Sequence, residues 1–234
     1  LAAIKMEVER NFPPSNDFLL KVRGLCTSKG IVLIFDECTS GFRETFGGLH
    51  KKYNVNPDIA MFGKALGNGY AITSIIGRRN IMEAAQSTFI SSTFWTERIG
   101  PVAALATLEL MEKERSWEYI TNLGLTLRSS IVDIANTAGL SISTTGIPAL
   151  TGFNFNHPLA LIFKTYLTQE LLKKGYLAAT ATYLSTAHSK RIIDGYLLEL
   201  VPIMDTLASA SQDRIDIKNL LKGPVCQSGF KRLN

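Results

Sequence analysis

Cysteine and histidine are scarce in this chain of 234 residues, which contains three of each. The cysteines (Cys26, Cys38 and Cys226) have no metal-ligand spacing, and their odd number argues against a disulfide framework. We therefore expect reduced thiols, a cytoplasmic location and no metal site. The histidines do not cluster in sequence with a serine or cysteine nucleophile, so the sequence predicts no hydrolytic triad.

Long apolar runs and a strong charge imbalance are also missing. No stretch approaches the roughly 18 apolar residues that a membrane span needs, and the first residues show no signal-peptide pattern. The net charge is +5 with the basic residues scattered along the chain, which does not favour nucleic-acid binding. A hydrophobic content of 46% is typical of a globular protein with one large domain or two small ones.

The most informative stretch of the chain is an apolar strand that ends in an acidic residue. Ile31–Phe35 is a continuous apolar run between Gly30 and Asp36, which predicts a strand buried on both faces of a parallel sheet. A second short apolar run, Ile59–Phe62, is followed by Lys64. Because ligands of open α/β sheets bind beyond the carboxyl ends of the strands, Asp36 and Lys64 are expected to face one crevice.

The remaining pattern alternates strands with helices. Strands are expected at 2–8, 71–76, 141–144, 149–155 and 177–187, and helices at 15–30, 80–85, 102–114, 117–138 with an interruption at Gly124, 159–174 and 190–210. The polar, glycine-containing segment 39–48 is expected to form an active-site loop. The fold class predicted from this order is α/β.

A carboxylate and a lysine in one pocket suit a pyridoxal phosphate (PLP) enzyme. In such enzymes the lysine forms a Schiff base with the cofactor aldehyde, and an acidic residue pairs with the protonated pyridine nitrogen. An ion pair at roughly 4 Å is worth about 4 kcal/mol at an effective dielectric near 20, or about three pKa units. This is enough to keep a pyridine ring protonated at neutral pH, which makes the ring a better electron sink.

The segments FDECTSGFRETFGG and PDIAMFGKALGNG resemble the signature of class III PLP-dependent aminotransferases, and are most similar to the glutamate-1-semialdehyde aminomutase-like subgroup. The resemblance extends from about Ala3 to His188. It implies the PLP-dependent transferase fold type I and a homodimer with the cofactor site near the subunit interface. It also implies an amino donor and a carbonyl acceptor that are small molecules.

The resemblance assigns roles to individual residues. Asp36 would pair with the pyridine nitrogen, and Lys64 would be the Schiff-base lysine. Cys38 takes the place of a valine that packs on the cofactor ring, where it should act as a small apolar substitute. A threonine five residues before a proline would reach the cofactor phosphate of the partner subunit; counting back from Pro101 gives Thr96, with Thr93 as the second candidate.

The chain is expected to be the carboxy-terminal part of a longer enzyme. It begins with Leu1, and the half that carries the family's phosphate loop has no counterpart in it. We expect residues 1–101 to be part of a large, mainly parallel-sheet domain, 102–210 to be a small α+β domain, and 211–234 to be a tail. Such a fragment should be poorly stable and inactive by itself.

The function favoured by the sequence is intermolecular amino transfer to a sugar or another carbonyl compound. Three alternatives to this function remain. The strand VLIFDE resembles the acidic strand of a nucleoside triphosphatase, but the phosphate loop that this motif requires is missing. An intramolecular amino shift, as in the aminomutases, is disfavoured because the segment LAATATYLSTAH lacks their glutamate. The non-enzyme alternative is a cofactor-less relative that serves as a dimeric scaffold. The sequence does not identify the donor or the acceptor.

Overall fold

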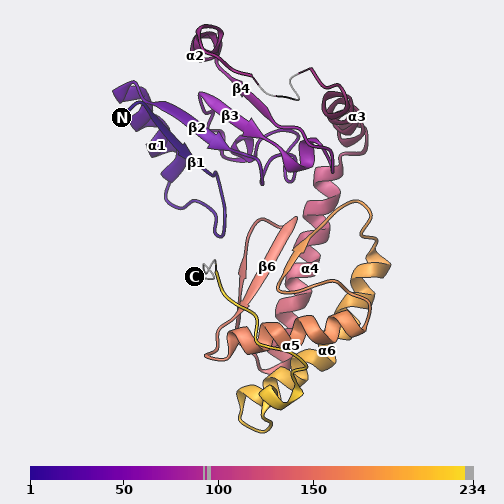
Figure 1. Ribbon diagram of the computed structural model, residues 1–234. Coiled ribbons are helices and arrows are strands. Elements are labelled where there is room, and N and C mark those ends of the chain that lie inside the picture. The colour runs from indigo at the N-terminus through magenta and orange to yellow at the C-terminus, as the bar shows by residue number, and fades with distance from the viewer. Residues whose placement is uncertain (92, 94–95, 230–234) are drawn as a thin grey trace. The chain divides into compact units, whose positions relative to one another are not determined.

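The computed structural model describes residues 1–91, 93 and 96–229, which form two compact units. The first unit comprises residues 1–121 and the second residues 122–234. The division therefore falls later in the chain than the boundary after residue 101 that the sequence suggested. Figure 1 shows the helices and strands as ribbons, with a colour that runs from indigo at the N-terminus to yellow at the C-terminus.

The first unit is built on a four-stranded sheet with the order β1-β2-β3-β4. Its strands are β1 (Ala3–Met6), β2 (Val32–Asp36), β3 (Ile59–Phe62) and β4 (Ser74–Gly77). The first three strands run parallel and β4 is antiparallel to β3. The mainly parallel α/β sheet predicted from the sequence is confirmed, and the carboxyl ends of β2 and β3 lie at one edge (Figure 1).

Burial along β2 alternates, which differs from the expected burial on both faces. Leu33 and Phe35 are fully buried, whereas Ile34 and Asp36 are only half-buried. The alternation follows from the period of two in a strand, which sends successive side chains to opposite faces of the sheet. Asp36 therefore lies on the less covered face.

Helix α1 (Phe18–Lys29) connects β1 to β2 and packs against β2. It ends at Gly30, as predicted, where a φ of 64° suits a residue without a Cβ atom. The buried carboxylate of Asp58 accepts hydrogen bonds from Arg23 of α1 and from the Leu33 backbone amide, both at 2.8 Å. This carboxylate links the helix, β2 and the start of β3.

Helix α3 (Ile99–Glu114) belongs to the first unit, although the sequence suggested that the second domain begins at residue 102. Ala104 lies in a buried cluster with Phe42 and Phe62, and Leu108 and Met111 pack against the same cluster. The helix pattern shows that one face is apolar, but not which core that face covers. Short elements complete the unit: η1 (Leu49–Tyr53), η2 (Lys64–Leu66), α2 (Arg79–Met82) and η3 (Glu83–Ser87).

The second unit has a three-stranded antiparallel sheet covered by helices, with the strand order β5-β6-β7. Its elements are α4 (Ser116–Ala138), which begins in the first unit, β5 (Ile142–Thr145), β6 (Leu150–Phe155), α5 (Ala160–Lys173), β7 (Ala181–Tyr183), α6 (Lys190–Ser211) and η4 (Ile217–Leu220). Buried side chains of α5 and α6, Phe163, Leu167, Leu200 and Leu207 among them, form much of its core.

Three expectations for the second unit need correction. Gly124 does not interrupt α4, which is continuous; a Cβ atom at this position would overlap the Pro148 carbonyl, so the glycine permits close approach of two backbones. The strand expected at 177–187 is limited to β7. The expected tail contains η4, where Ile217 is buried and η4 contacts α5.

Across the described parts of the chain, no helix combines the length and the apolar character that crossing a membrane requires.

Candidate active site

Asp36 and Lys64, the catalytic residues predicted from the sequence, lie at the carboxyl ends of β2 and β3. Asp36 is the last residue of β2 and pairs in register with Met61 of β3, three positions before Lys64. The segment 37–39 continues from β2, while Gly63 and Lys64 continue from β3. Parallel neighbouring strands thus deliver both groups to one edge of the sheet.

The Asp36 carboxylate is held by two donors from different segments. Its Oδ2 atom lies 2.7 Å from Nζ of Lys5 on β1, and its Oδ1 atom accepts a hydrogen bond of 3.2 Å from the Cys38 backbone amide. The hydrogen bond from Lys5, together with that from Cys38, holds the pKa of Asp36 below its ordinary value despite partial burial. Asp36 is therefore an ionised, accessible carboxylate at neutral pH.

Lys64 has an unusual backbone conformation and a specific side-chain partner. Its φ is 45°, in the left-handed region that residues with a Cβ atom rarely adopt. Backbone strain of this kind is concentrated at functional sites. The carbonyl of Lys64 accepts hydrogen bonds from the amides of Gly67 and Asn68, which holds the turn. The exposed Nζ atom donates to Oγ1 of Thr39 at 2.6 Å.

Cys38 lies between the aspartate and the lysine. Its amide contacts Asp36, and its Sγ atom would be 3.5 Å from a Cβ atom placed on Gly63, the residue before Lys64. Burial raises the pKa of the Cys38 thiol, and the neighbouring Asp36 adds to this effect. The thiol is therefore neutral at pH 7 and suits packing better than nucleophilic chemistry.

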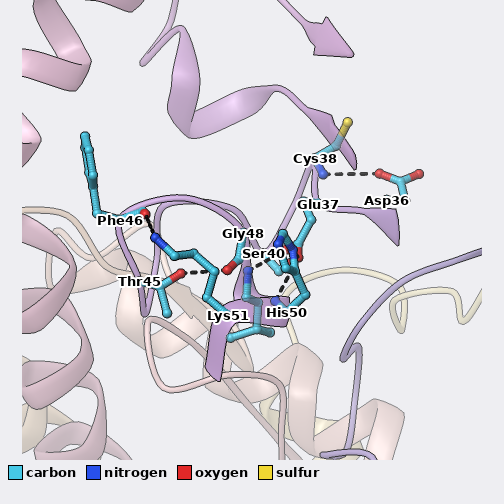
Figure 2. Close-up of polar contacts among 10 residues, drawn as sticks. Asp36, Glu37, Cys38, Ser40, Thr45, Phe46, Gly48, His50 and Lys51 are labelled. Atoms are coloured by element: carbon cyan, nitrogen blue, oxygen red, sulfur yellow. Dashed lines mark hydrogen bonds and ion pairs between the residues drawn. The ribbon is translucent and has the colours of Figure 1, made fainter. Parts of the chain in front are cut away.

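Glu37, the residue after Asp36, points into the protein. Its side chain is fully buried and accepts hydrogen bonds from the Ser40 hydroxyl at 2.5 Å, from the Leu49 and His50 amides at 3.0 Å each, and from Nδ1 of His50 at 2.8 Å. Because an ionised carboxylate only accepts hydrogen bonds, Nδ1 of His50 carries the proton. Figure 2 shows Glu37 directed toward Ser40 and His50, while Asp36 reaches the Cys38 amide.

The loop after Glu37 is ordered by its own hydrogen bonds. The Gly41 amide donates to the Glu37 carbonyl at 2.8 Å, and the Phe42 amide donates to the Gly47 carbonyl at 2.7 Å. Arg43 also donates to the Thr39 carbonyl at 2.9 Å. The loop predicted at 39–48 is thus present, and it holds Thr39 within hydrogen-bonding distance of Lys64.

Three of the predicted site residues, Asp36, Cys38 and Lys64, lie close together in the structure. The segment of Cys38 and Thr39 contacts both the Asp36 carboxylate and the Lys64 amine. Thr96 is exposed in a turn before α3, and its two preceding residues lie outside the described part of the chain. The role of Thr96 stays a prediction, as does that of the second candidate, Thr93.

Sequence reasoning missed Lys5 and Thr39, which contact Asp36 and Lys64 respectively. Lys5 is a charged residue within an otherwise apolar strand, and this pattern in the sequence could have marked it as a candidate. Its partner could not be identified without the pairing of β1 with β2, in which Lys5 is opposite Ile34. Since Ile34 and Asp36 are two residues apart, they share a face of the sheet with Lys5.

Residues 11–190, or 180 of the 234 residues, match the model of the protein family described as "Aminotransferase class-III". The chain belongs to the class-III aminotransferase family. It is 34% identical over 157 residues to 3-aminobutyryl-CoA aminotransferase of Cloacimonas acidaminovorans (strain Evry), covering 67% of this chain and 38% of that protein. It is 30% identical over 199 residues to glutamate-1-semialdehyde 2,1-aminomutase of Methanosphaera stadtmanae, covering 78% of this chain and 47% of that protein.

Among solved structures, this class-III chain resembles the PLP internal aldimine form of the FumI protein of Sphingopyxis sp. MTA144. The TM-score is 0.82 at 21% identity, with 93% of this chain and 54% of that chain covered. The predicted transferase fold is confirmed by this likeness. The chain spans less than half the length of the two curated relatives that it matches and about half of the solved structure.

Proposed function

We propose that the protein to which this chain belongs is a PLP-dependent aminotransferase that moves an amino group from a small-molecule donor to a carbonyl acceptor. The observation that carries this proposal is the placement of Lys64 and Asp36 at neighbouring strand ends, both in contact with the segment of Cys38 and Thr39. Membership of the class-III family supports it.

The residues present fit PLP by the chemistry of their side chains. Lys64 offers an exposed primary amine for the cofactor aldehyde, and Asp36 offers an ionised carboxylate for the ring nitrogen. Lys5 and Cys38 donate to Asp36, and a carboxylate has about four lone-pair sites, so Asp36 retains the capacity to accept another hydrogen bond. When bound, PLP supplies an electron sink that stabilises negative charge on the substrate carbon.

Each residue of the site has a separate task. Lys64 would hold the cofactor through Nζ and, once released, would carry a proton at that atom to and from the substrate carbon. The Thr39 hydroxyl orients Nζ through the hydrogen bond of 2.6 Å. Asp36 would keep a proton on the ring nitrogen, and the neutral Cys38 side chain would pack beside the ring.

Lys64→Ala in the complete protein tests this assignment. We expect the visible absorption band that PLP gives on binding to disappear, together with turnover. Lys29→Ala removes an exposed lysine at the end of α1 and is the matched control, which should retain both. An unchanged absorption band in Lys64→Ala would contradict the proposal. The cofactor-less scaffold alternative predicts no band in any of these proteins.

The second candidate function is an intramolecular amino shift, which the similarity to the aminomutase of Methanosphaera stadtmanae supports. Transfer between two molecules releases a keto product from the amino donor, whereas an intramolecular shift releases none. We favour intermolecular transfer because the segment 177–188 lacks the glutamate of the aminomutases. Assaying the purified protein for keto-acid release from candidate donors separates the two functions.

We also propose a homodimer with the cofactor site near the subunit interface and Thr96 directed to the partner's cofactor phosphate. Large apolar side chains on α3 support this proposal, because Ile99, Val102 and Leu105 are each more than 60% exposed. Exposed apolar groups gathered on one helix are typical of interaction surfaces. Sedimentation analysis of the complete protein tests the dimer, and Thr96→Val tests the phosphate contact through the dissociation constant for PLP.

A further inference from the structure

Lys5 stands out among the charged residues of the first unit because it contacts the proposed cofactor partner directly. Its Nζ atom lies 2.7 Å from Oδ2 of Asp36, and its side chain is 54% exposed. The pairing of β1 with β2 places Lys5 opposite Ile34, on the face of the sheet that carries Asp36. The contact therefore follows from the strand register and not from a chance approach of two flexible side chains.

The two oxygens of Asp36 have different partners. Oδ2 contacts the Lys5 ammonium, and Oδ1 accepts the Cys38 amide hydrogen at 3.2 Å. One donor comes from β1 and the other from the loop after β2, so the carboxylate is held from two sides. Rotation about the bond to the carboxylate would break both contacts together.

We propose that Lys5 is a positioning residue that orients the Asp36 carboxylate and shares its negative charge with the cation that the site binds. This proposal rests on the proposed function for the identity of that cation, the protonated ring of PLP. Lys5 would not have to leave when the cofactor binds, because a carboxylate has about four lone-pair sites and Asp36 keeps acceptor capacity beyond its present contacts. A cation next to the carboxylate lowers the field that Asp36 exerts on the ring nitrogen. Lys5 therefore moderates the affinity of the site for a protonated ring.

The first experiment measures the ionisation of Asp36 in the complete protein without cofactor. Carbon-13 NMR of labelled aspartate follows the Asp36 carboxyl group as a function of pH in the wild type, Lys5→Met and Lys5→Arg. Because Lys5 lowers the pKa of Asp36, we expect the midpoint to move upward in Lys5→Met and to remain near the wild-type value in Lys5→Arg. Lys21→Met, which removes an exposed lysine from α1, is the control for net charge and should leave the midpoint unchanged.

The second experiment compares PLP with 1-deaza-PLP, which has carbon in place of the ring nitrogen. The ratio of their dissociation constants reports how strongly Asp36 favours the ring nitrogen. We expect Lys5→Met to increase the preference for PLP by about fivefold, the upper end for an exposed ion pair, and Lys5→Arg to leave it unchanged. This ratio depends on charge at the ring and is insensitive to a general loss of packing.

The outcomes separate this inference from the proposed function. An unmoved Asp36 midpoint in Lys5→Met, or equal shifts in Lys5→Met and Lys5→Arg, would overturn the role of Lys5. An unchanged preference ratio in a protein that binds PLP would overturn the charge sharing and leave the proposed function standing. If the wild type binds neither compound, the proposed function fails, and the NMR titration still decides whether Lys5 holds Asp36.

Discussion

Asp36 and Glu37 are adjacent carboxylates with opposite surroundings. Glu37 is fully buried and accepts hydrogen bonds from Ser40, Leu49 and His50. Asp36 is half-buried, and its carboxylate contacts the Lys5 ammonium and the Cys38 amide. The alternation of side chains at a strand end sends one carboxylate inward and the other toward the open face of the sheet.

The difference separates a structural carboxylate from one that remains available for binding. A buried charge is tolerated only when donors replace the water that it has lost, and the partners of Glu37 do this. Those partners fix the loop that follows, and the loop positions Thr39 against Lys64. Glu37 thus stabilises the loop that positions Thr39, while Asp36 keeps acceptor capacity for a ligand.

The largest expected effect comes from removing the charge of Asp36. In the complete protein, Asp36→Asn should lower turnover about a thousandfold, since an ion pair of about 4 kcal/mol corresponds to three factors of ten. Steady-state kinetics measures the loss, with the exposed Asp133→Asn as a control that retains activity. Turnover within tenfold of the wild type would show that Asp36 does not act on the cofactor ring.

Removal of Glu37 should instead change stability. Glu37→Ala leaves the Leu49 and His50 donors without their acceptor in a buried site, so we expect a loss of about 3 kcal/mol in the free energy of unfolding. Urea denaturation of the complete protein measures this loss. Asp36→Ala is the matched variant, and its unfolding midpoint should stay close to the wild type. Equal losses in the two variants would contradict the distinction between the two carboxylates.

Adding a methyl group at Gly48, which lies beside Glu37, or at Gly63, which lies beside Cys38, tests how tightly the surroundings of the two carboxylates are packed. A Cβ atom at Gly48 would overlap the His50 ring and lie 2.8 Å from Oε1 of Glu37, so Gly48→Ala should cost about 2 kcal/mol. A Cβ atom at Gly63 would lie 3.3 Å from Thr73 and 3.5 Å from Cys38, so Gly63→Ala should cost under about 1 kcal/mol. Thermal unfolding of both variants measures the difference, which should vanish if the Glu37 cluster is loosely packed.

The smallest effect is a dependence of stability on pH. Burial by itself raises the pKa of Glu37, but the hydrogen bonds from His50, Ser40 and the Leu49 amide outweigh it and hold the pKa below the ordinary 4.5. Glu37 therefore contributes stability that is present above pH 4.5 and is lost as the pH falls through the lowered value. Urea denaturation on both sides of pH 4.5 should show a shallower loss in Glu37→Gln; identical pH profiles would argue against this contribution.

Several parts of the fold could be predicted because they depend on local pattern. The bounds of β3 agree with the apolar run at 59–62, and α1 ends at Gly30 as expected. The strand expected at 177–187 was too long, because an apolar segment of this length does not reveal where backbone pairing stops; only Ala181–Tyr183 pairs with β6. A glycine within a helical pattern predicts an interruption at Gly124, and its close approach to Pro148 could not be predicted because the two residues are distant in sequence.

By itself, the sequence determined the order of strands and helices, the α/β class, and the positions of Asp36 and Lys64 after two apolar strands. These features follow from periodicity and from the chemistry of single residues, which can be read along the chain. Only the tertiary structure decided that Lys5 pairs with Asp36, that Glu37 is buried with His50, and that α3 packs in the first unit. These contacts depend on strand register and on packing between segments far apart in sequence, which no local pattern encodes.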